Sequence, residues 1–185
     1  MCSSDLEALE LFSRHAFRRN HPTEDYMELS ERVANYARGI PLALKVFGSY
    51  LLDRKKEVWV SAIDKLETIP PKGIHEVLKI SYDGLDCEEK NIFLDIAHFF
   101  KWSDIELVKA FIEACGFQAD IGIDVLIDKS LITKSDNKIT MHDLLQAMAR
   151  EIVRQESIED PGKRSRLWHH EDIYRILTKN SVRFN

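Results

Sequence analysis

The chain has 185 residues, of which 44% are hydrophobic, and its formal net charge is −5 at pH 7. This length and composition predict a compact protein of one or two domains, and the acidic balance removes any general attraction to nucleic acid or anionic lipid. The three cysteines are widely spaced, so the sequence supports neither a disulfide framework nor a zinc site. No apolar run approaches the roughly 20 residues that cross a bilayer, and membrane insertion and secretion are likewise unsupported. We therefore expect a protein of a reducing cytosol.

Residues 1–70 carry apolar side chains at helical intervals and predict four helices. Residues 4–7 have the spacing of a capping box that opens the first helix, and Pro22 breaks the chain before the second. Gly39 is expected to end the second helix and Pro41 to begin the third, because proline suits the first position of a helix. The four apolar repeats are Leu6, Leu9, Phe12 and Ala16; Tyr26, Leu29, Val33 and Ala37; Leu42, Ala43, Val46, Phe47, Tyr50 and Leu51; and Trp59, Ala62, Ile63 and Leu66.

Pro70 and Pro71 mark the clearest boundary in the chain, since consecutive prolines remove the donors that a helix needs. They separate a first helical unit at residues 1–70 from a second unit at residues 71–157. A polar and basic segment follows at residues 158–185 and ends in one more helical repeat, formed by Ile173, Ile176 and Leu177.

The second unit changes its pattern partway along. Helices are expected first, with capping boxes at residues 86–89 and 103–106 and a helix end at Gly116. Residues 131–133 and 138–141 are then short β-prone runs on either side of a turn-rich triplet, which predicts a small hairpin before a helix that starts near His142. The order of three helices and a hairpin is that of a winged-helix domain, so we expect a mainly α fold: a four-helix bundle followed by a winged helix with a small β-hairpin.

The residue patterns of common enzymes are missing. Seven glycines are scattered singly, and the one Gly-Lys step, at Gly162 and Lys163, lacks the upstream glycine of a phosphate-binding loop. His169 and His170 are adjacent, so they cannot share a helical face as a pair of metal ligands would. We expect no independent nucleotide hydrolysis and no enzymatic activity of the chain by itself.

A winged helix often binds DNA, which makes a transcriptional regulator the natural alternative. The segment that would enter the major groove, residues 118–129, holds three aspartates and one lysine. Phosphates would repel this segment, so a switch or protein-interaction role is favoured over nucleic-acid binding.

Two short segments are candidates for contact with a ligand. At residues 39–44, a glycine stop and a proline start explain the residues by helix geometry alone, whereas a functional interpretation has the rigid turn present Pro41 and apolar atoms to a flat base. At residues 140–145, Thr140 and Asp143 have capping-box spacing, which explains both of them. His142 is either a surface histidine or, beside unpaired backbone amides, a contact for an anion such as phosphate.

These segments, in this order, resemble the NB-ARC module of plant disease-resistance proteins, specifically the class with an N-terminal TIR domain and C-terminal leucine-rich repeats. Ile40 and His98 are small departures, since leucine and cysteine are usual at those places. The matching segments are residues 7–17, similar to the opening of the helical lid; 39–44, similar to the GLPL motif; 78–85 and 92–100, similar to the start of the winged helix; 141–143, similar to the MHD motif; and 161–168, similar to the linker toward the repeats.

The resemblance implies a nucleotide-operated switch. In that family a preceding α/β domain supplies the P-loop and the Mg²⁺-binding aspartate, and this sequence starts after both, so it looks like a truncated product or a fragment. In the implied ADP-locked state, Pro41 and Leu42 of the four-helix lid bundle contact the adenine, His142 reaches the β-phosphate and Asp143 holds the loop. Exchange for ATP would release the winged helix. ADP or ATP is thus expected in the full-length receptor, and neither is expected on the isolated chain.

The implied partners are the P-loop, TIR and leucine-rich-repeat domains of the parent receptor, together with further copies in an activated oligomer. The implied location is the cytoplasm, with the nucleus as a second compartment. An alternative is the winged-helix module of another signalling ATPase or of a transcriptional regulator.

Overall fold

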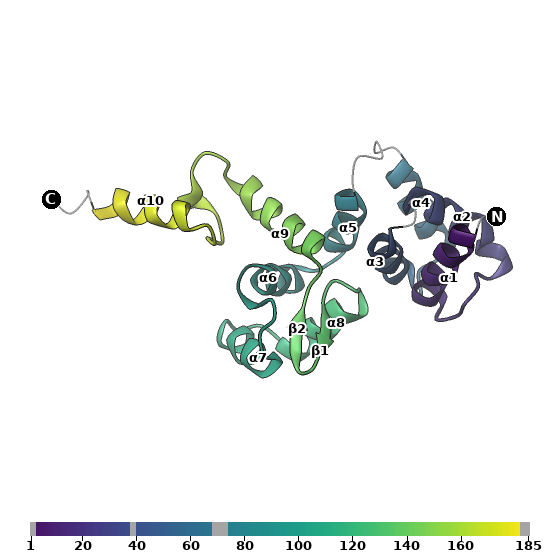
Figure 1. Ribbon diagram of the computed structural model, residues 1–185, viewed down its shortest axis with the longest axis horizontal. Helices are drawn as coiled ribbons and strands as arrows, with labels where there is room; N and C mark the ends of the chain where they lie inside the picture. Colours follow the sequence, from purple (N-terminus) through teal and green to yellow (C-terminus); the bar gives the residue numbers. More distant parts are fainter. Residues whose placement is uncertain (1–2, 38–39, 68–73, 182–185) are drawn as a thin grey trace.

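The computed structural model describes residues 3–37, 40–67 and 74–181. In these ranges the chain is mainly helical with one two-stranded antiparallel sheet, which confirms the predicted fold class. The molecule is elongated: the N-terminal bundle lies at one end, the winged helix in the middle and the last helix at the other end (Figure 1).

The bundle consists of α1 (Ser3–Phe17), α2 (Met27–Ala37), α3 (Pro41–Leu51) and α4 (Lys56–Glu67), with a 3-10 turn at Glu24–Tyr26. Helices α1 and α3 lie very close together at Gly48, where an added Cβ would be 2.8 Å from His15 Cβ. The predicted apolar stripe of α1 is wrong at Leu6, which is 53% exposed; burial begins at Ala8 and Leu9. The core of the bundle is formed around Phe12, Leu44, Phe47, Leu51, Trp59 and Ile63.

Helix α5 (Ile74–Asp83) joins the bundle to the winged helix and lies between them (Figure 1). The two cores meet here, since Val46 of α3 packs into the winged-helix core and Ile80 of α5 packs into the bundle core. The hydroxyls of Ser49 and Ser130 add a hydrogen bond of 3.0 Å across the junction. The predicted helix stop at Gly39 and the boundary at residues 70–71 fall outside the described residues, and the division into domains at that point stays a prediction.

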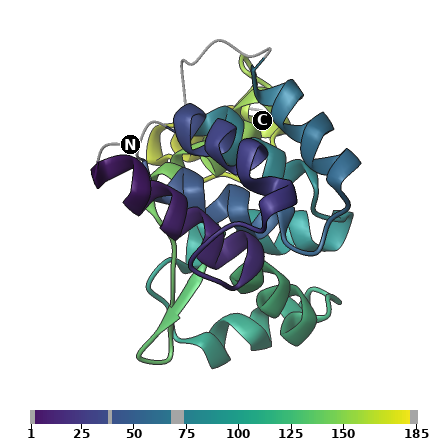
Figure 2. The ribbon, with the colours of Figure 1, turned by 90° about the vertical axis from the view of Figure 1, so that its right-hand side faces the viewer.

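The winged helix consists of α6 (Cys87–Asp95), a π-helical turn (Ile96–Phe100), α7 (Ile105–Ala114), α8 (Ala119–Asp128), β1 (Thr133–Ser135), β2 (Lys138–Thr140) and α9 (Asp143–Glu156). The strands pair antiparallel, with Thr133 opposite Thr140. Their turn has φ of 49° at Asp136 and 62° at Asn137, the left-handed conformation that two-residue hairpin turns require. Figure 2 shows the hairpin and helices α7 and α8 below the purple and blue bundle.

The expected helix caps of this domain are partly confirmed. Asp86 and Glu89 form the predicted capping box of α6. The box predicted at residues 103–106 is wrong, because Asp104 is the N-cap of α7 and its side chain accepts from the Glu106 amide. The Ser103 carbonyl instead accepts a hydrogen bond of 2.9 Å from the Ile139 amide of the hairpin.

The last segment contains a 3-10 turn at Pro161–Lys163 and α10 (His170–Ser181), which confirms the last predicted helix. Two arginines with shielded side chains, Arg164 and Arg166, hold the segment before α10. The side chains of Tyr174 and Leu177 on α10 remain largely exposed.

Candidate functional site

The turn that carries His142 and Asp143 is positioned by buried neighbours on both sides. Met141 and Leu145 are buried in the winged-helix core, whereas His142 and Asp143 are exposed. This alternation anchors the turn and leaves its two polar side chains facing solvent.

His142 is the N-cap of α9. Its backbone is extended, and its Nδ1 accepts a hydrogen bond of 3.2 Å from the Leu144 amide. The predicted capping box of Thr140 and Asp143 is therefore wrong: Thr140 belongs to β2, where its hydroxyl lies 2.6 Å from that of Thr133. The pairing of the hairpin removes Thr140 from the helix start.

The cap determines which ring nitrogen of His142 carries the proton. Because Nδ1 accepts from a backbone N–H, the neutral ring carries its proton on Nε2. An exposed N–H donor thus stands at the N-terminus of a 14-residue helix, where the macrodipole and unpaired amides favour an anion.

Asp143 is held from a distant part of the chain. Its carboxylate accepts from Lys101 Nζ, and this contact, together with the positive charge of Lys101, lowers the pKa of Asp143 below its usual value of 3.8. Lys101 also donates to Gln146 Oε1 at 3.4 Å. The lysine is only 15% exposed although its partner is 90% exposed, so Lys101 is the fixed member of the pair.

The other two predicted contact residues lie on the bundle. Pro41 is the first residue of α3, as predicted, and it is exposed. Leu42 is half-buried and packs against the winged-helix core. Among the described residues, no hydrogen bond or ion pair links this helix start to His142. The predicted residues thus lie at two separate helix starts, and a ligand would have to contact both to connect them.

Sequence reasoning missed Lys101 as part of this site. It lies 42 positions from Asp143, directly after the π-helical turn, and no local spacing connects the two. A lysine that follows a strongly apolar helix was the only signal.

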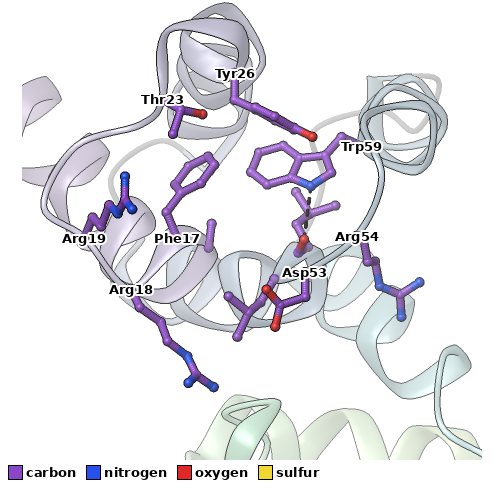
Figure 3. A pocket seen from close by; sticks show the side chains of 11 residues that line it. Phe17, Arg18, Arg19, Thr23, Tyr26, Asp53, Arg54 and Trp59 are labelled. Carbon is purple, nitrogen blue, oxygen red and sulfur yellow. Dashed lines mark hydrogen bonds between the residues drawn. The ribbon is translucent and has the colours of Figure 1, made fainter.

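A hollow of about 370 Å³ opens at the end of the bundle, away from these residues (Figure 3). Phe17, Tyr26 and Trp59 form its aromatic wall, and the indole of Trp59 donates to the Leu51 carbonyl at 3.0 Å. The guanidinium groups of Arg18 and Arg54 point away from it (Figure 3). The hollow offers no converging charge for an anion and contains none of the predicted contact residues.

Within the described ranges, no three histidine, cysteine or acidic side chains gather as they would around a metal ion. Over the same ranges, no helix has the length and apolar character of a membrane span.

The winged helix and the chain as a whole both match known plant proteins. Residues 86–157 match the family "Disease resistance protein Roq1-like, winged-helix domain". The chain is 51% identical over 172 residues to disease resistance protein RUN1 of Vitis rotundifolia, a match that covers 93% of this chain and 13% of the relative. It is 42% identical over 178 residues to TMV resistance protein N of Nicotiana glutinosa, covering 96% of this chain and 15% of the relative.

A third relative, disease resistance protein RPV1 of Vitis rotundifolia, is 49% identical over 93% of this chain and 12% of its own length. The chain thus spans about an eighth of the length of these curated relatives. The likeness includes the segments with the His142 turn and the α3 start, because the matches extend over nearly the whole chain. The chain therefore belongs to the family of plant disease resistance proteins, and its residues 86–157 form a Roq1-like winged-helix domain.

Proposed function

We propose that this chain is the lid and winged-helix part of an ADP- and ATP-operated switch in an intracellular plant immune receptor. In this proposal His142 donates to the β-phosphate of ADP, and Pro41 and Leu42 contact the adenine. The P-loop of a preceding domain would hold the remaining phosphate oxygens. The chain contributes closing contacts to the switch and no catalysis of its own.

The observation that carries the proposal is the capped state of His142. Its Nδ1 is occupied by the Leu144 amide, so the exposed Nε2–H, otherwise bonded to water, is available to donate to an acceptor such as a phosphate oxygen. The side chain is exposed at the positive end of α9, which adds to the attraction. A hydrogen bond to a charged group contributes about 1.5–3 kcal/mol, enough to bias a two-state switch by roughly ten- to hundredfold.

The junction between bundle and winged helix supports a ligand shared by two bodies. Val46 and Leu42 of α3 pack on the winged-helix core, and the Ser49 and Ser130 hydroxyls meet at 3.0 Å. A nucleotide that touches both the α3 start and the His142 turn would favour the closed arrangement only by its greater affinity for that arrangement.

The charge of α8 argues against the DNA-binding alternative. Asp120, Asp124 and Asp128 are exposed on this helix, and Lys109 of α7 is engaged with Asp120 at 2.6 Å. A recognition helix with this charge would be repelled by the phosphate backbone.

The test uses a chimera in which this chain follows an intact P-loop domain of an NB-ARC protein, with ADP affinity measured by calorimetry. His142→Asn keeps a good N-cap residue but removes the Nε2–H donor, so it is expected to weaken ADP binding by about ten- to hundredfold at nearly unchanged stability. His142→Ala should weaken ADP equally and also lower the melting temperature, because the cap is lost.

His170→Ala, at an exposed histidine remote from the turn, is the matched control and should change neither quantity. Unchanged ADP affinity in His142→Asn, in a chimera that binds ADP tightly, would reduce His142 to a helix cap. The chain alone should bind ADP no tighter than about millimolar, because its sequence contains no phosphate-binding loop.

A further inference from the structure

The π-helical turn Ile96–Phe100 touches the His142–Asp143 turn from one side. The Ala97 carbonyl accepts a hydrogen bond of 2.8 Å from Gln146 Nε2, near the start of α9. Lys101, the residue directly after the turn, contacts both Asp143 and Gln146. These bonds connect the first turn of α9 to a π-helical turn, an uncommon element that is frequent at functional sites.

The same turn holds the segment that leads to α10 from its other side. His98 is buried, its Nδ1–H donates to the Leu94 carbonyl at 2.7 Å, and its ring meets Trp168 edge-on at 4.6 Å between centroids. Asp95, directly before the turn, accepts from Arg166 Nε at 2.7 Å. The Arg166 and Asp95 side chains are only 9% and 14% exposed, so this contact is shielded from water.

The geometry of a π-helical turn makes it an element with two possible arrangements. A π-helical turn contains one residue more than an α-helical turn. If the turn changed to the α-helical form, the chain after it would rotate by about 100° relative to α6. Lys101 would then no longer face Asp143, and His98 would no longer face Trp168. The contacts on the two sides of the turn therefore depend on the same backbone register.

We propose that Lys101 is the positioning residue of the His142–Asp143 turn, and that the π-helical turn Ile96–Phe100 couples this turn to the segment that holds Arg166 and Trp168. Loss of the Lys101 contacts loosens residues 164–168 and so frees α10, and loosening that segment weakens the hold on α9. The use of this coupling in a receptor rests on the proposed function, but the coupling itself is a property of the chain.

Amide hydrogen exchange of the whole chain, resolved by residue, tests the coupling without any nucleotide. Lys101→Met removes the charge that holds Asp143 and keeps the length of the side chain. The Ser165 amide, which donates to Glu156 at 2.6 Å, reports on the distant segment, and the Leu131 amide, which donates to Leu126 at 2.9 Å in the core, reports on global opening.

We expect Lys101→Met to accelerate exchange at Ser165 by at least about threefold relative to Leu131, a size typical of coupling between sites. Because coupling is reciprocal, Trp168→Ala should accelerate exchange of the Leu144 and Gln146 amides by a similar factor. Lys101→Arg, which keeps the charge, should restore most of the protection. Lys109→Met is the matched control, since it breaks the Lys109–Asp120 pair of the same domain and touches no part of the π-helical turn.

Faster exchange at Leu144 and Gln146 in Lys101→Met, with Ser165 unchanged relative to Leu131, would overturn the proposal. If Lys101→Met opens the whole domain, Gln146→Met decides, because it removes the bonds of Gln146 to Ala97 and to Lys101 and leaves the Lys101–Asp143 pair in place; Ser165 must then exchange faster than in Lys109→Met. A chimera that binds no ADP while these exchange effects persist would refute the proposed function and leave the coupling intact.

Discussion

Arg166 and Asp95 form a shielded ion pair although they lie 71 positions apart, with Arg166 Nε donating to Asp95 Oδ1 over 2.7 Å. Arg166 also donates from Nη2 to the carbonyl and side-chain oxygens of Asn91, each at 3.1 Å. The pair joins α6 to the segment before α10.

Asp95→Asn is expected to lower the free energy of unfolding by about 2–3 kcal/mol, because it leaves the Arg166 charge shielded from water and uncompensated. The two Asn91 acceptors keep the loss below the roughly 3–5 kcal/mol that breaking a fully buried pair costs. Urea unfolding measures the change. Asp83→Asn, which breaks the half-exposed Lys79–Asp83 pair, is the control and should cost less than about 0.5 kcal/mol. Equal losses in the two variants would show that Arg166 is not shielded.

Gly122→Ala is expected to destabilise the winged helix by about 1–2 kcal/mol, since overpacking outweighs the better helix propensity of alanine. An added Cβ would lie 2.3 Å from Ile92 Cδ1, and the Ile92 side chain is fully buried. Ile92→Val removes that atom, so the double variant should be at least as stable as Ile92→Val alone. A double-mutant cycle measures this, and additive losses would contradict the steric explanation.

The stability of the chain is expected to depend on pH through two histidines. Burial lowers the pKa of His98 and of His15 below 6.5, and nearby Arg166 and Arg150 add to the effect at His98, whereas Asp95 and the Leu94 carbonyl oppose it. Lys45 adds to it at His15. Both groups therefore bind protons more readily in the unfolded chain.

Stability should be complete above pH 6.5 and should decrease as the pH falls from there toward the lowered folded pKa values. The contribution of Asp143 to stability is lost at a lower pH, because its pKa is below 3.8 and its pairing with Lys101 is broken only in stronger acid. Melting temperatures between pH 8 and pH 5 test the histidine effect. His98→Phe should flatten the curve and His170→Gln should leave it unchanged; a curve that is flat in the wild-type chain would refute the expectation.

Limited proteolysis tests the division into domains. We expect the first cut close to residues 70–71, where the sequence is typical of a linker, and slow cleavage within the apolar stretch of residues 93–100. In the segment after α9, Ser165 donates from its amide and hydroxyl to Glu156, and Arg164 Nε donates to the Ser157 carbonyl. Cleavage in residues 161–166 should therefore be slower than near residue 70, and should become faster in Asp95→Asn.

The helix starts show where local reasoning succeeds and where it does not. Asp86 and Pro41 begin their helices as predicted, because the cap and the proline act on backbone groups within the same turn. Thr140 and Ser103 were each expected to cap a helix and do not. Thr140 is paired with Thr133 in the hairpin, and the Ser103 carbonyl is bound to the Ile139 amide. Strand pairing, which joins distant residues, outcompeted the local capping motif at Thr140, whereas at residues 103–106 the neighbouring Asp104 took the cap position.

The sequence by itself determined the order of helices and hairpin, the apolar faces that form the two cores, the family and the position of His142 at a helix start, because each depends on residues within a few positions of one another. The tertiary structure alone decided that Lys101 holds Asp143, that Arg166 is buried against Asp95, and that a π-helical turn stands between them. These contacts join residues 42 and 71 positions apart. Their geometry follows from how α6, α9 and the segment before α10 pack together, which no local spacing in the chain encodes.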